Sequence, residues 1–441
     1  MKLREWFDLR GPKYVRQRAA VLLDRYGVAP AKATKRVDGF VATLAEYGCA
    51  PTFPTPGRVV QRHSHYFRHL QDSGVEIAVH GFDHVDLNAY PPAEASKQLA
   101  RAADVFADNG IEVHGFRCPY LSCTDDLVDC LPKGVFKYSS NEAIWWDGCE
   151  STIASSNRNN RSTVFETLLR FYQPRSAQDA VCVPWARSGT VEIPLCVPDD
   201  LQLHDGLLLG PEGIAQAWSQ VLKQTYRRGE LYTLNFHPEL ASLCKQPIIV
   251  LVHEAKRLQP PVWIARLRDI SDWWQEKSGF RVEVSHTSTG LHISFTCSER
   301  ATILVRGLGP CGSEHARCPE PVEGWDGAYY QLRTKALYVP AEPRPFVGLP
   351  ANAPKGVVSF LREQGYILDT GETATRCGTY IDPATMDRLT SEVKLIDYIE
   401  ASTGPLVRYW RWPSGAKSAM CVTGDLDALT LLDYASRLFA R

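Results

Sequence analysis

Two histidines four residues apart, His80 and His84, are the first residues of this chain whose types and spacing suggest chemistry. They follow residues 75–79, where branched apolar side chains alternate as they do in a buried strand. A separation of four places two imidazoles on one side of a helical turn, close enough to share one metal ion. An HxxxH pair is more often one core and one surface histidine. The position at the carboxyl end of a strand, where α/β barrels hold their active sites, favours a metal site.

A second pair with the same spacing, His65 and His69, lacks this position. It lies inside residues 58–73, whose pattern predicts an amphipathic helix. The pattern predicts no strand directly before the pair. We interpret these two histidines as part of a solvated helical face.

Further predicted strands lead into residues that could do chemistry. The strand 112–116 leads into Arg117, Cys118, Pro119 and Tyr120, and the strand 135–138 into Trp145, Trp146 and Asp147. The strand 231–238 carries His237 near its end, and the buried run 418–428 carries Asp425 and Asp427. Strand, polar tip and helix repeat over about 200 residues, which predicts a parallel barrel or a doubly wound sheet.

Composition limits the classes of protein that this chain can be. Its 441 residues suggest two or three domains, and 44% hydrophobic with 22% charged residues is an ordinary globular balance. A net charge of -1 gives no sign of a nucleic-acid or acidic-membrane partner. Residues 1–8 lack the apolar core of a signal peptide, and no apolar run could span a bilayer. Thirteen cysteines without CxxC spacing indicate free thiols in a reducing compartment, so we expect a cytoplasmic protein.

The sequence HGFDH at residues 80–84, the run from Arg117 to Tyr120, and the late strand ending in His237 together resemble the polysaccharide deacetylases. These are the NodB-like carbohydrate esterases of family 4. The resemblance covers residues from about 40 to 278, and its motifs are short but occur in the family's order. It implies an α/β fold, a distorted (β/α)7 barrel.

The family's first motif is a strand with two aspartates, one a base and one a metal ligand, and no such strand precedes Tyr47 here. The run 418–428, with Asp425 and Asp427, resembles that motif with one residue between the aspartates. We interpret this as a circular permutation in which the last strand pairs beside the strand around Thr52. Two alternatives stay open: the strand completes a neighbouring chain's barrel, or it begins a second domain.

We therefore expect three parts. Residues 1–278 form the barrel without its first strand and include a helix at 263–274 on the exterior. Residues 279–350 change to a period of two and predict a small inserted β-sandwich, as readily a spacer as a carbohydrate-binding unit. Residues 351–441 return the chain to the barrel and carry the strand with Asp425 and Asp427.

The resemblance implies a metal centre made of His80, His84 and Asp427. Two histidines and one carboxylate suit a catalytic Zn²⁺, with Co²⁺, Mn²⁺ and Fe²⁺ as alternatives. Asp425 takes the place of the family's base, which removes a proton from the attacking water. Arg117 takes the place of the residue that orients this base and keeps it ionised.

The remaining roles are also carried over from the family. The backbone N–H of Tyr120 is expected to stabilise the oxyanion, and Pro119 fixes the backbone before that donor. His237 is expected to protonate the departing amine as general acid.

The substrate side of the site is matched more loosely. Trp145 or Trp146 is expected to wall a sugar groove, and Asp147 to lie beside His237 and tune its pKa. Cys118 has no histidine near it in sequence to activate it, so we interpret it as a packed thiol.

These assignments predict a metal-dependent hydrolase of amide bonds that removes the N-acetyl group of an amino sugar in a polysaccharide or glycoconjugate. One alternative keeps the barrel and metal but acts on another small or cyclic amide. Another is a non-catalytic carbohydrate-binding protein with a degenerate barrel. The expected partner is the acetylated sugar, with no nucleic acid and no membrane span. An oligomer stays open, because domain swapping and permutation predict the same residues.

Overall fold

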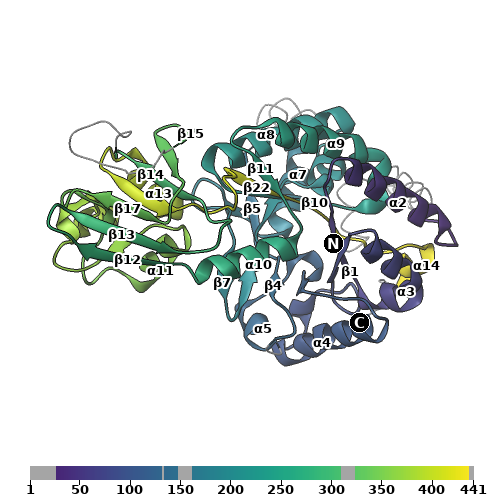
Figure 1. The fold of residues 1–441 in the computed structure, drawn as a ribbon. Helices are drawn as coiled ribbons and strands as arrows, with labels where there is room; N and C mark the ends of the chain where they lie inside the picture. The colour runs from purple at the N-terminus through teal and green to yellow at the C-terminus, as the bar shows by residue number, and fades with distance from the viewer. Residues whose placement is uncertain (1–25, 132–133, 148–160, 309–322, 437–441) are drawn as a thin grey trace.

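The computed structural model describes residues 26–131, 134–147, 161–308 and 323–436 of the chain. Figure 1 shows a large part, in which helices surround a sheet, and a smaller part rich in strands at its side. No helix within these ranges is long and apolar enough to cross a membrane. Apolar residues at steps of three and four also predict a helix at residues 15–26, which falls almost wholly outside these ranges.

A twelve-stranded sheet forms the centre of the large part, in the order β6-β5-β9-β10-β22-β1-β2-β3-β4-β8-β7, with β11 also pairing to β22. Its strands are β1 (Thr52–Thr55), β2 (Glu76–Val79), β3 (Gly115–Phe116), β4 (Tyr138–Ser139), β5 (Ala143–Trp145), β6 (Arg175–Ser176), β7 (Trp185–Arg187), β8 (Thr190–Glu192), β9 (Leu195–Val197), β10 (Leu231–Phe236), β11 (Val262–Ile264) and β22 (Ser418–Gly424). Among the described strands of this sheet, every pairing except β7 with β8 is parallel. This confirms the predicted curled parallel barrel sheet.

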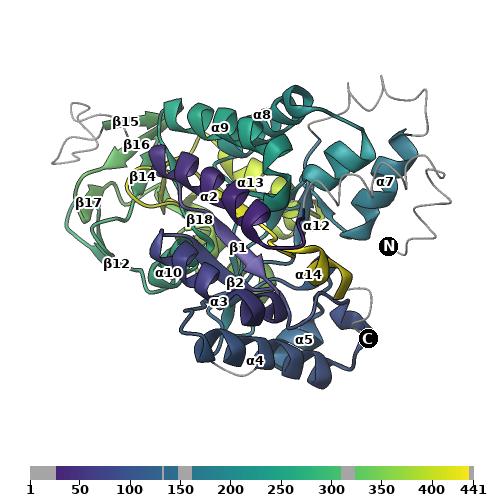
Figure 2. The ribbon, with the colours of Figure 1, turned by 90° about the vertical axis from the view of Figure 1, so that its right-hand side faces the viewer.

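Helices cover this sheet from outside (Figures 1 and 2). They are α2 (Ala31–Glu46), α3 (Gly57–Asp72), α4 (Pro92–Asp108), α5 (Asp125–Asp129), α7 (Arg161–Phe171), α8 (Pro211–Arg228), α9 (Ala241–Arg257), α10 (Leu267–Ser278) and α14 (Leu431–Ser436). In α2, Val37, Phe40, Val41 and Leu44 are spaced by three and four residues, so one stripe is buried against the barrel.

The helix predicted at residues 263–274 is wrong at its start. Residues Val262–Ile264 form β11 and pair with the beginning of β22, and α10 begins only at Leu267. The backbone N–H of Leu267 donates to Thr52 Oγ1 (3.1 Å), and that of Arg268 donates to Glu76 Oε2 (3.0 Å). Thr52 and Glu76 begin β1 and β2, so α10 lies across the amino ends of these strands.

The smaller part contains three sheets: β12-β13-β17, β15-β16-β14-β21, and β19-β18-β20. Its elements are β12 (Arg281–His286), β13 (Leu291–Thr296), β14 (Ile303–Arg306), β15 (Glu323–Asp326), β16 (Tyr329–Leu332), β17 (Ala336–Val339), β18 (Arg344–Gly348), α11 (Lys355–Glu363), β19 (Leu368–Asp369), β20 (Cys377–Tyr380), α12 (Pro383–Arg388), α13 (Glu392–Ala401) and β21 (Leu406–Tyr409). The predicted return to the barrel at residue 351 comes too early, because β21 pairs with β14 and β18 pairs with β19 and β20. These long-range pairings leave no local signal in the sequence.

Strand β22 lies inside the sheet of its own chain, between β10 and β1. It pairs with β10 over six residues, from Leu231 with Ala419 to Phe236 with Gly424, and meets β1 where Thr52 faces Thr423. All seven of its residues are buried. The sequence placed this strand beside Thr52, and the structure has it there.

Asp433 fastens the segment after β22 to α3. Its buried carboxylate accepts hydrogen bonds from the backbone N–H groups of Leu429 (3.2 Å) and Thr430 (3.0 Å), and it pairs with Arg62 (2.8 Å) and His63 (2.9 Å). Burial by itself raises the pKa of Asp433, but the hydrogen bonds from His63, Arg62 and Thr430 lower it below its ordinary value. The charged carboxylate therefore stabilises the folded chain at neutral pH, and this stabilisation is lost as the pH falls below the ordinary value of about 4.

We expect Asp433→Asn to lower the free energy of unfolding by about 1–3 kcal/mol at pH 7, because an amide cannot satisfy these donors. Urea unfolding at pH 7 and pH 3.5 measures this, and the difference from the parent should shrink at the lower pH. Asp397→Asn, a change at an exposed carboxylate of α13, is the control and should alter stability by less than about 0.5 kcal/mol. Equal effects of the two variants would show that Asp433 does not fasten this segment.

Candidate active site

The side chains of His80, His84 and Asp427 converge at one point and are all buried. Their potential ligand atoms lie within 4.8 Å of one another. His80 Nε2 is 3.6 Å from Asp427 Oδ1, and His84 Nε2 is 3.5 Å from Asp427 Oδ2. The histidines come from the loop after β2, and the aspartate follows β22. Two segments far apart in sequence, which follow strands on either side of β1, thus supply this cluster.

The two histidines do not lie on a helical turn, as their spacing suggested. Residues 80–86 form an irregular loop, and Gly81 has a φ of 74°. A Cβ at Gly81 would lie 2.8 Å from the carbonyl oxygen of Asp83, so the sharp turn requires glycine. The loop is fastened from outside by an ion pair between Asp83 and Arg58. The imidazole rings still meet, with their centroids 5.0 Å apart.

His80 is arranged as a metal ligand. Its Nδ1 lies 2.8 Å from the carbonyl oxygen of Arg117, which can only accept a hydrogen bond, so the proton is on Nδ1. The lone pair of Nε2 then faces Asp427, which is also an acceptor. Nε2 is fully buried, and it has no hydrogen-bond partner in the described part of the chain. A cation between two facing acceptors relieves their repulsion, so these residues fit a divalent metal.

Arg117 holds Asp425 beside the metal-ligand cluster. The guanidinium is fully buried, and its Nη1 donates to Asp425 Oδ1 (2.8 Å) and to Asn235 Oδ1 (2.7 Å). The other donors of Arg117 reach the carbonyl oxygen of Ser140 (3.1 Å) and the hydroxyl of Thr423 (3.1 Å). Asp425 Oδ2 lies 3.9 Å from His80 Nε2. The predicted partnership of Arg117 with Asp425 is present in the structure.

The sequence did not single out Asn235, Ser140 or Thr423. Each is a fully or almost fully buried polar residue, and Asn235 and Thr423 lie within otherwise apolar strands. A buried polar group needs a hydrogen-bond partner. The asparagine between Leu234 and Phe236 therefore indicated that this strand contacts a polar site.

His237 is paired with Asp200, which the sequence also did not single out. His237 Nδ1 lies 2.9 Å from Asp200 Oδ1, and its backbone N–H donates to Asp200 Oδ2 (2.9 Å). The prediction that Asp147 tunes His237 is corrected by this contact: Asp147 follows β5, whereas Asp200 follows β9, the strand that pairs with β10. The sequence signal for Asp200 was the pair of carboxylates, Asp199 and Asp200, that follows the apolar run 193–198.

The pKa of His237 is strongly raised. Burial lowers this pKa, but the charge and hydrogen bond of Asp200, with smaller contributions from Asp427 and Glu239, outweigh burial and raise it to about 10. The imidazolium is therefore the form present at neutral pH in the metal-free protein, and a protonated His237 can act as an acid. Burial and the charge of Asp200 also raise the pKa of Asp199 to about 7.

We expect Asp200→Asn to lower the pKa of His237 in metal-free protein by at least about one unit, because the neighbouring negative charge is lost. NMR titration of the labelled imidazoles measures it, with His237→Gln assigning the signal. Asp147→Asn is the matched control and should leave the pKa in place. A larger shift from Asp147→Asn than from Asp200→Asn would reverse the assignment.

The loop after β3 lies against the metal-ligand cluster. Tyr120 has a φ of 62°, and its ring packs edge-on against His84 with centroids 4.7 Å apart. The backbone N–H of Cys118 donates to Asn141 Oδ1 (2.7 Å), and the backbone N–H of Asn141 donates to Glu192 Oε1 (2.6 Å). These bonds fix the loop that includes Pro119. Cys118 is itself fully buried, which raises the pKa of its thiol and agrees with a packed residue.

The two tryptophans after residue 144 lie in different surroundings. Trp146 is 1% exposed and lies in the core with the guanidinium of Arg228 over its ring, so it is too deeply packed to wall a groove. Trp145 is half-buried and packs edge-on against Phe165 of α7. Of the two predicted sugar-contacting tryptophans, only Trp145 remains a candidate.

Comparison with known proteins finds one family that is similar to part of this chain. The polysaccharide deacetylase family matches residues 24–134. No curated protein matches the chain. Similar solved structures include a polysaccharide deacetylase described as putative from Mycobacterium smegmatis, at 20% identity and a TM-score of 0.41 over 54% of this chain and 76% of that one. Another is the peptidoglycan deacetylase PdaC from Bacillus subtilis, at 16% identity and a TM-score of 0.32 over 57% of this chain and 89% of that one.

The structure named Puue Allantoinase is similar to the same degree, at 16% identity and a TM-score of 0.40 over 56% of this chain and 73% of that one. The family match itself covers His80 and His84 and the loop from Arg117 to Tyr120. Over residues 24–134, the chain is similar to the polysaccharide deacetylase family.

Proposed function

We propose that this protein is a metal-dependent deacetylase that hydrolyses the N-acetyl group of an amino sugar in a polysaccharide or glycoconjugate. One observation carries the proposal: Asp425 and Asp427 lie more than 300 residues after His80, yet they meet it at one point. A degenerate, non-catalytic barrel has no need to hold two carboxylates and two imidazoles together there. The family match over residues 24–134 supports an amide-bond hydrolase.

His80, His84 and Asp427 would hold the metal, with Zn²⁺ as the first candidate and Co²⁺, Mn²⁺ and Fe²⁺ as alternatives. When bound, such an ion supplies a water of lowered pKa and polarises the carbonyl of the substrate. The hydrogen bond from His80 Nδ1 to the carbonyl of Arg117 keeps the Nε2 lone pair directed at the ion.

Asp425 is the proposed base, and Arg117 holds it in position. The two side chains form a buried ion pair, and the contact with Asn235 fixes the guanidinium. With Oδ1 engaged by Arg117, Oδ2 is the oxygen on the His80 side and is the one suited to take a proton from water.

His237 is the proposed acid for the departing amine. Asp200 holds its Nδ1 and favours the protonated ring, which leaves Nε2–H as the group that can give a proton. The backbone N–H of Tyr120 is the proposed oxyanion donor, since its loop lies against His84. Trp145 remains the proposed side-chain contact for a sugar ring.

The position of β22 supports a circular permutation as the origin of this arrangement. In a domain-swapped dimer the same pairings would join two chains. Light scattering of the purified protein separates the two, because the permuted barrel is complete in a monomer. A dimer that loses its bound metal when diluted to monomers would favour the swap.

Acetate release tests the proposed activity. We expect release from N-acetylglucosamine oligomers or another acetylated amino sugar, lost after chelation and restored by Zn²⁺ or Co²⁺. The panel should include a cyclic amide such as allantoin. Turnover of the cyclic amide alone would select the alternative amidohydrolase, and no turnover of any substrate by the metal-loaded protein would contradict an enzyme of this class.

A further inference from the structure

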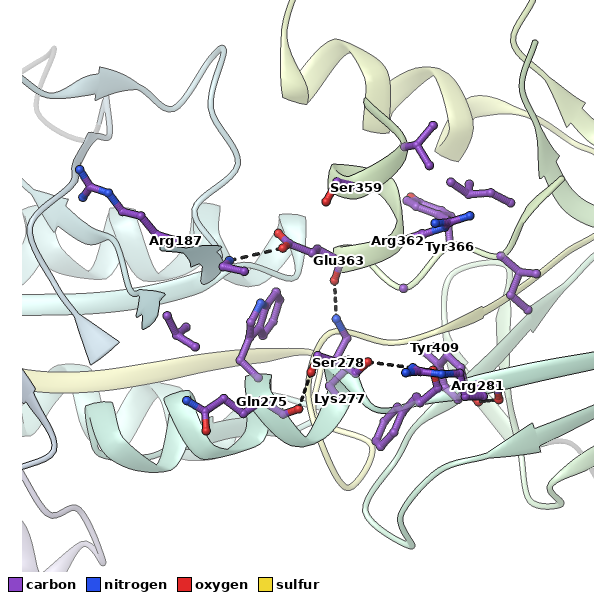
Figure 3. A pocket seen from close by; sticks show the side chains of 18 of the residues that line it. Arg187, Gln275, Lys277, Ser278, Arg281, Ser359, Arg362, Glu363, Tyr366 and Tyr409 are labelled. Carbon is purple, nitrogen blue, oxygen red and sulfur yellow. Dashed lines mark hydrogen bonds between the residues drawn. The ribbon is translucent and has the colours of Figure 1, made fainter. Parts of the chain in front are cut away.

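A cavity of about 860 Å³ lies between the barrel and the smaller part of the protein. Its walls are the β7–β8 hairpin, the end of α10, the start of β12, and α11 with the strand residues that follow it. Figure 3 shows side chains from these elements facing one another across it. This volume falls within the usual range for small-molecule sites, about 300–1,000 Å³.

The cavity is separate from the metal-ligand cluster. It lies at the end of α10, and α10 crosses the amino ends of β1 and β2 through its contacts with Thr52 and Glu76. His80 and Asp425 follow the opposite, carboxyl ends of β2 and β22. The cavity is therefore not an extension of the proposed deacetylase site.

Positive charge predominates in the lining of the cavity. Lys277, Arg281, Lys355 and Arg362 line it, with Glu363 as the only carboxylate among its lining residues. In the described ranges, Lys355 and Arg362 have no acidic partner, and Arg281 donates to the carbonyl oxygens of Ser278 (2.9 Å) and Phe280 (2.8 Å). A fifth cation, Arg187, is neutralised by Asp125 and Glu192.

Lys277 is the deepest of these cations. It is 8% exposed, and its ammonium donates to the backbone carbonyl of Glu363 and lies 4.1 Å from the ring centroid of Trp274. Burial lowers the pKa of Lys277 to about 7, and the nearby Arg408 and Arg411 lower it while Glu363 raises it. A carbonyl and a ring face do not neutralise an ammonium, so an anion in the cavity would stabilise the charged form.

We propose that this cavity binds a ligand that carries a phosphate group, of the size of a sugar phosphate or a nucleotide. Guanidinium groups bind phosphate oxygens through paired N–H donors, and Arg281 of β12 and Arg362 of α11 both line the cavity. The hydroxyl of Ser359 on α11 adds a neutral hydrogen-bonding group. The apolar side chains of Phe280, Ile367 and Leu368 provide surface for the rest of the ligand.

Calorimetric titration of the full-length protein tests the proposal. The probes are inorganic phosphate, N-acetylglucosamine 1-phosphate, uridine monophosphate and, as the uncharged comparison, N-acetylglucosamine. We expect at least one phosphorylated probe to bind at least 10-fold more tightly than N-acetylglucosamine, and the tightest probe identifies the source of the phosphate.

Three variants locate the binding. Arg281→Gln with Arg362→Gln should raise Kd by at least about 10-fold, because two charge-assisted contacts are lost. Lys223→Gln, at an exposed lysine on α8 away from the cavity, is the matched control and should leave Kd unchanged. His84→Ala separates the cavity from the metal centre and should also leave Kd unchanged.

The proposal is overturned if no phosphorylated probe binds more tightly than N-acetylglucosamine. It is also overturned if the tightest binding is lost in His84→Ala and kept in the double arginine variant. Thermal melts of all variants confirm folding. Neither result depends on deacetylase activity, so failure here leaves the proposed function standing.

Discussion

Asp427→Ala is expected to remove tightly bound metal from the protein and to lower deacetylation by about 1,000-fold or more. The carboxylate of Asp427 stands 3.6 Å from His80 Nε2 and 3.5 Å from His84 Nε2, so it contacts both imidazoles. Without it, two neutral imidazoles remain, and we expect the affinity for Zn²⁺ to fall by at least about 100-fold. Elemental analysis after dialysis measures metal per chain.

The neighbouring carboxylate is the control for this variant. Asp425→Asn preserves the three ligands and should retain about one ion per chain. If the parent and Asp427→Ala hold the same amount of metal, Asp427 is not a ligand and the proposed permuted site fails. If neither holds metal even after incubation with Zn²⁺, the binding-protein alternative takes precedence.

Asp425→Asn is expected to lower kcat by about 100- to 10,000-fold, because the proposed base can no longer accept a proton. The amide keeps the shape of the side chain and can still accept a hydrogen bond from Arg117 Nη1, which in the parent lies 2.8 Å from Oδ1. We therefore expect little change in KM and a folded variant that retains its metal. Steady-state kinetics on the best substrate of the acetate-release panel measures both constants.

A loss of binding would give a different pattern. If Asp425→Asn raises KM but leaves kcat within about 3-fold of the parent, Asp425 contacts substrate and is not the base. The pH profile gives a second readout, because the acidic limb that reports the base should be absent from the residual activity of Asp425→Asn.

The sequence predicted the parallel barrel and most of its site because strands and their polar tips leave local signals. The strand that carries His237 was predicted at residues 231–238, and the observed β10 has the same start but ends at Phe236. The place of β22 beside Thr52 was predicted from the resemblance of its two aspartates to the family's first motif, interpreted as a circular permutation. The resemblance to the deacetylases supplied the roles, which the residues alone did not.

The predictions that were wrong share one physical cause. Each concerned a contact that depends on which residues are neighbours in space. Asp200 and Asp147 both follow short strands, and only the pairing of β9 with β10 puts Asp200 beside His237. Trp145 and Trp146 are adjacent in sequence, but only Trp146 is packed under Arg228. The return to the barrel was placed too early because β21 pairs with β14, about 100 residues before it, and no local pattern records that contact.

The position of β22 also has a consequence for synthesis on the ribosome. Its partners β10 and β1 are made long before it, and at about 5–20 residues per second the segment between β10 and β22 takes about 10 to 40 s to emerge. During that interval the nascent barrel has a gap, with two unpaired strand edges on either side of it. Nascent chains of this protein should therefore depend on holding chaperones until residue 424 has left the exit tunnel. Neither the continuous sheet nor a complete metal site can exist before then.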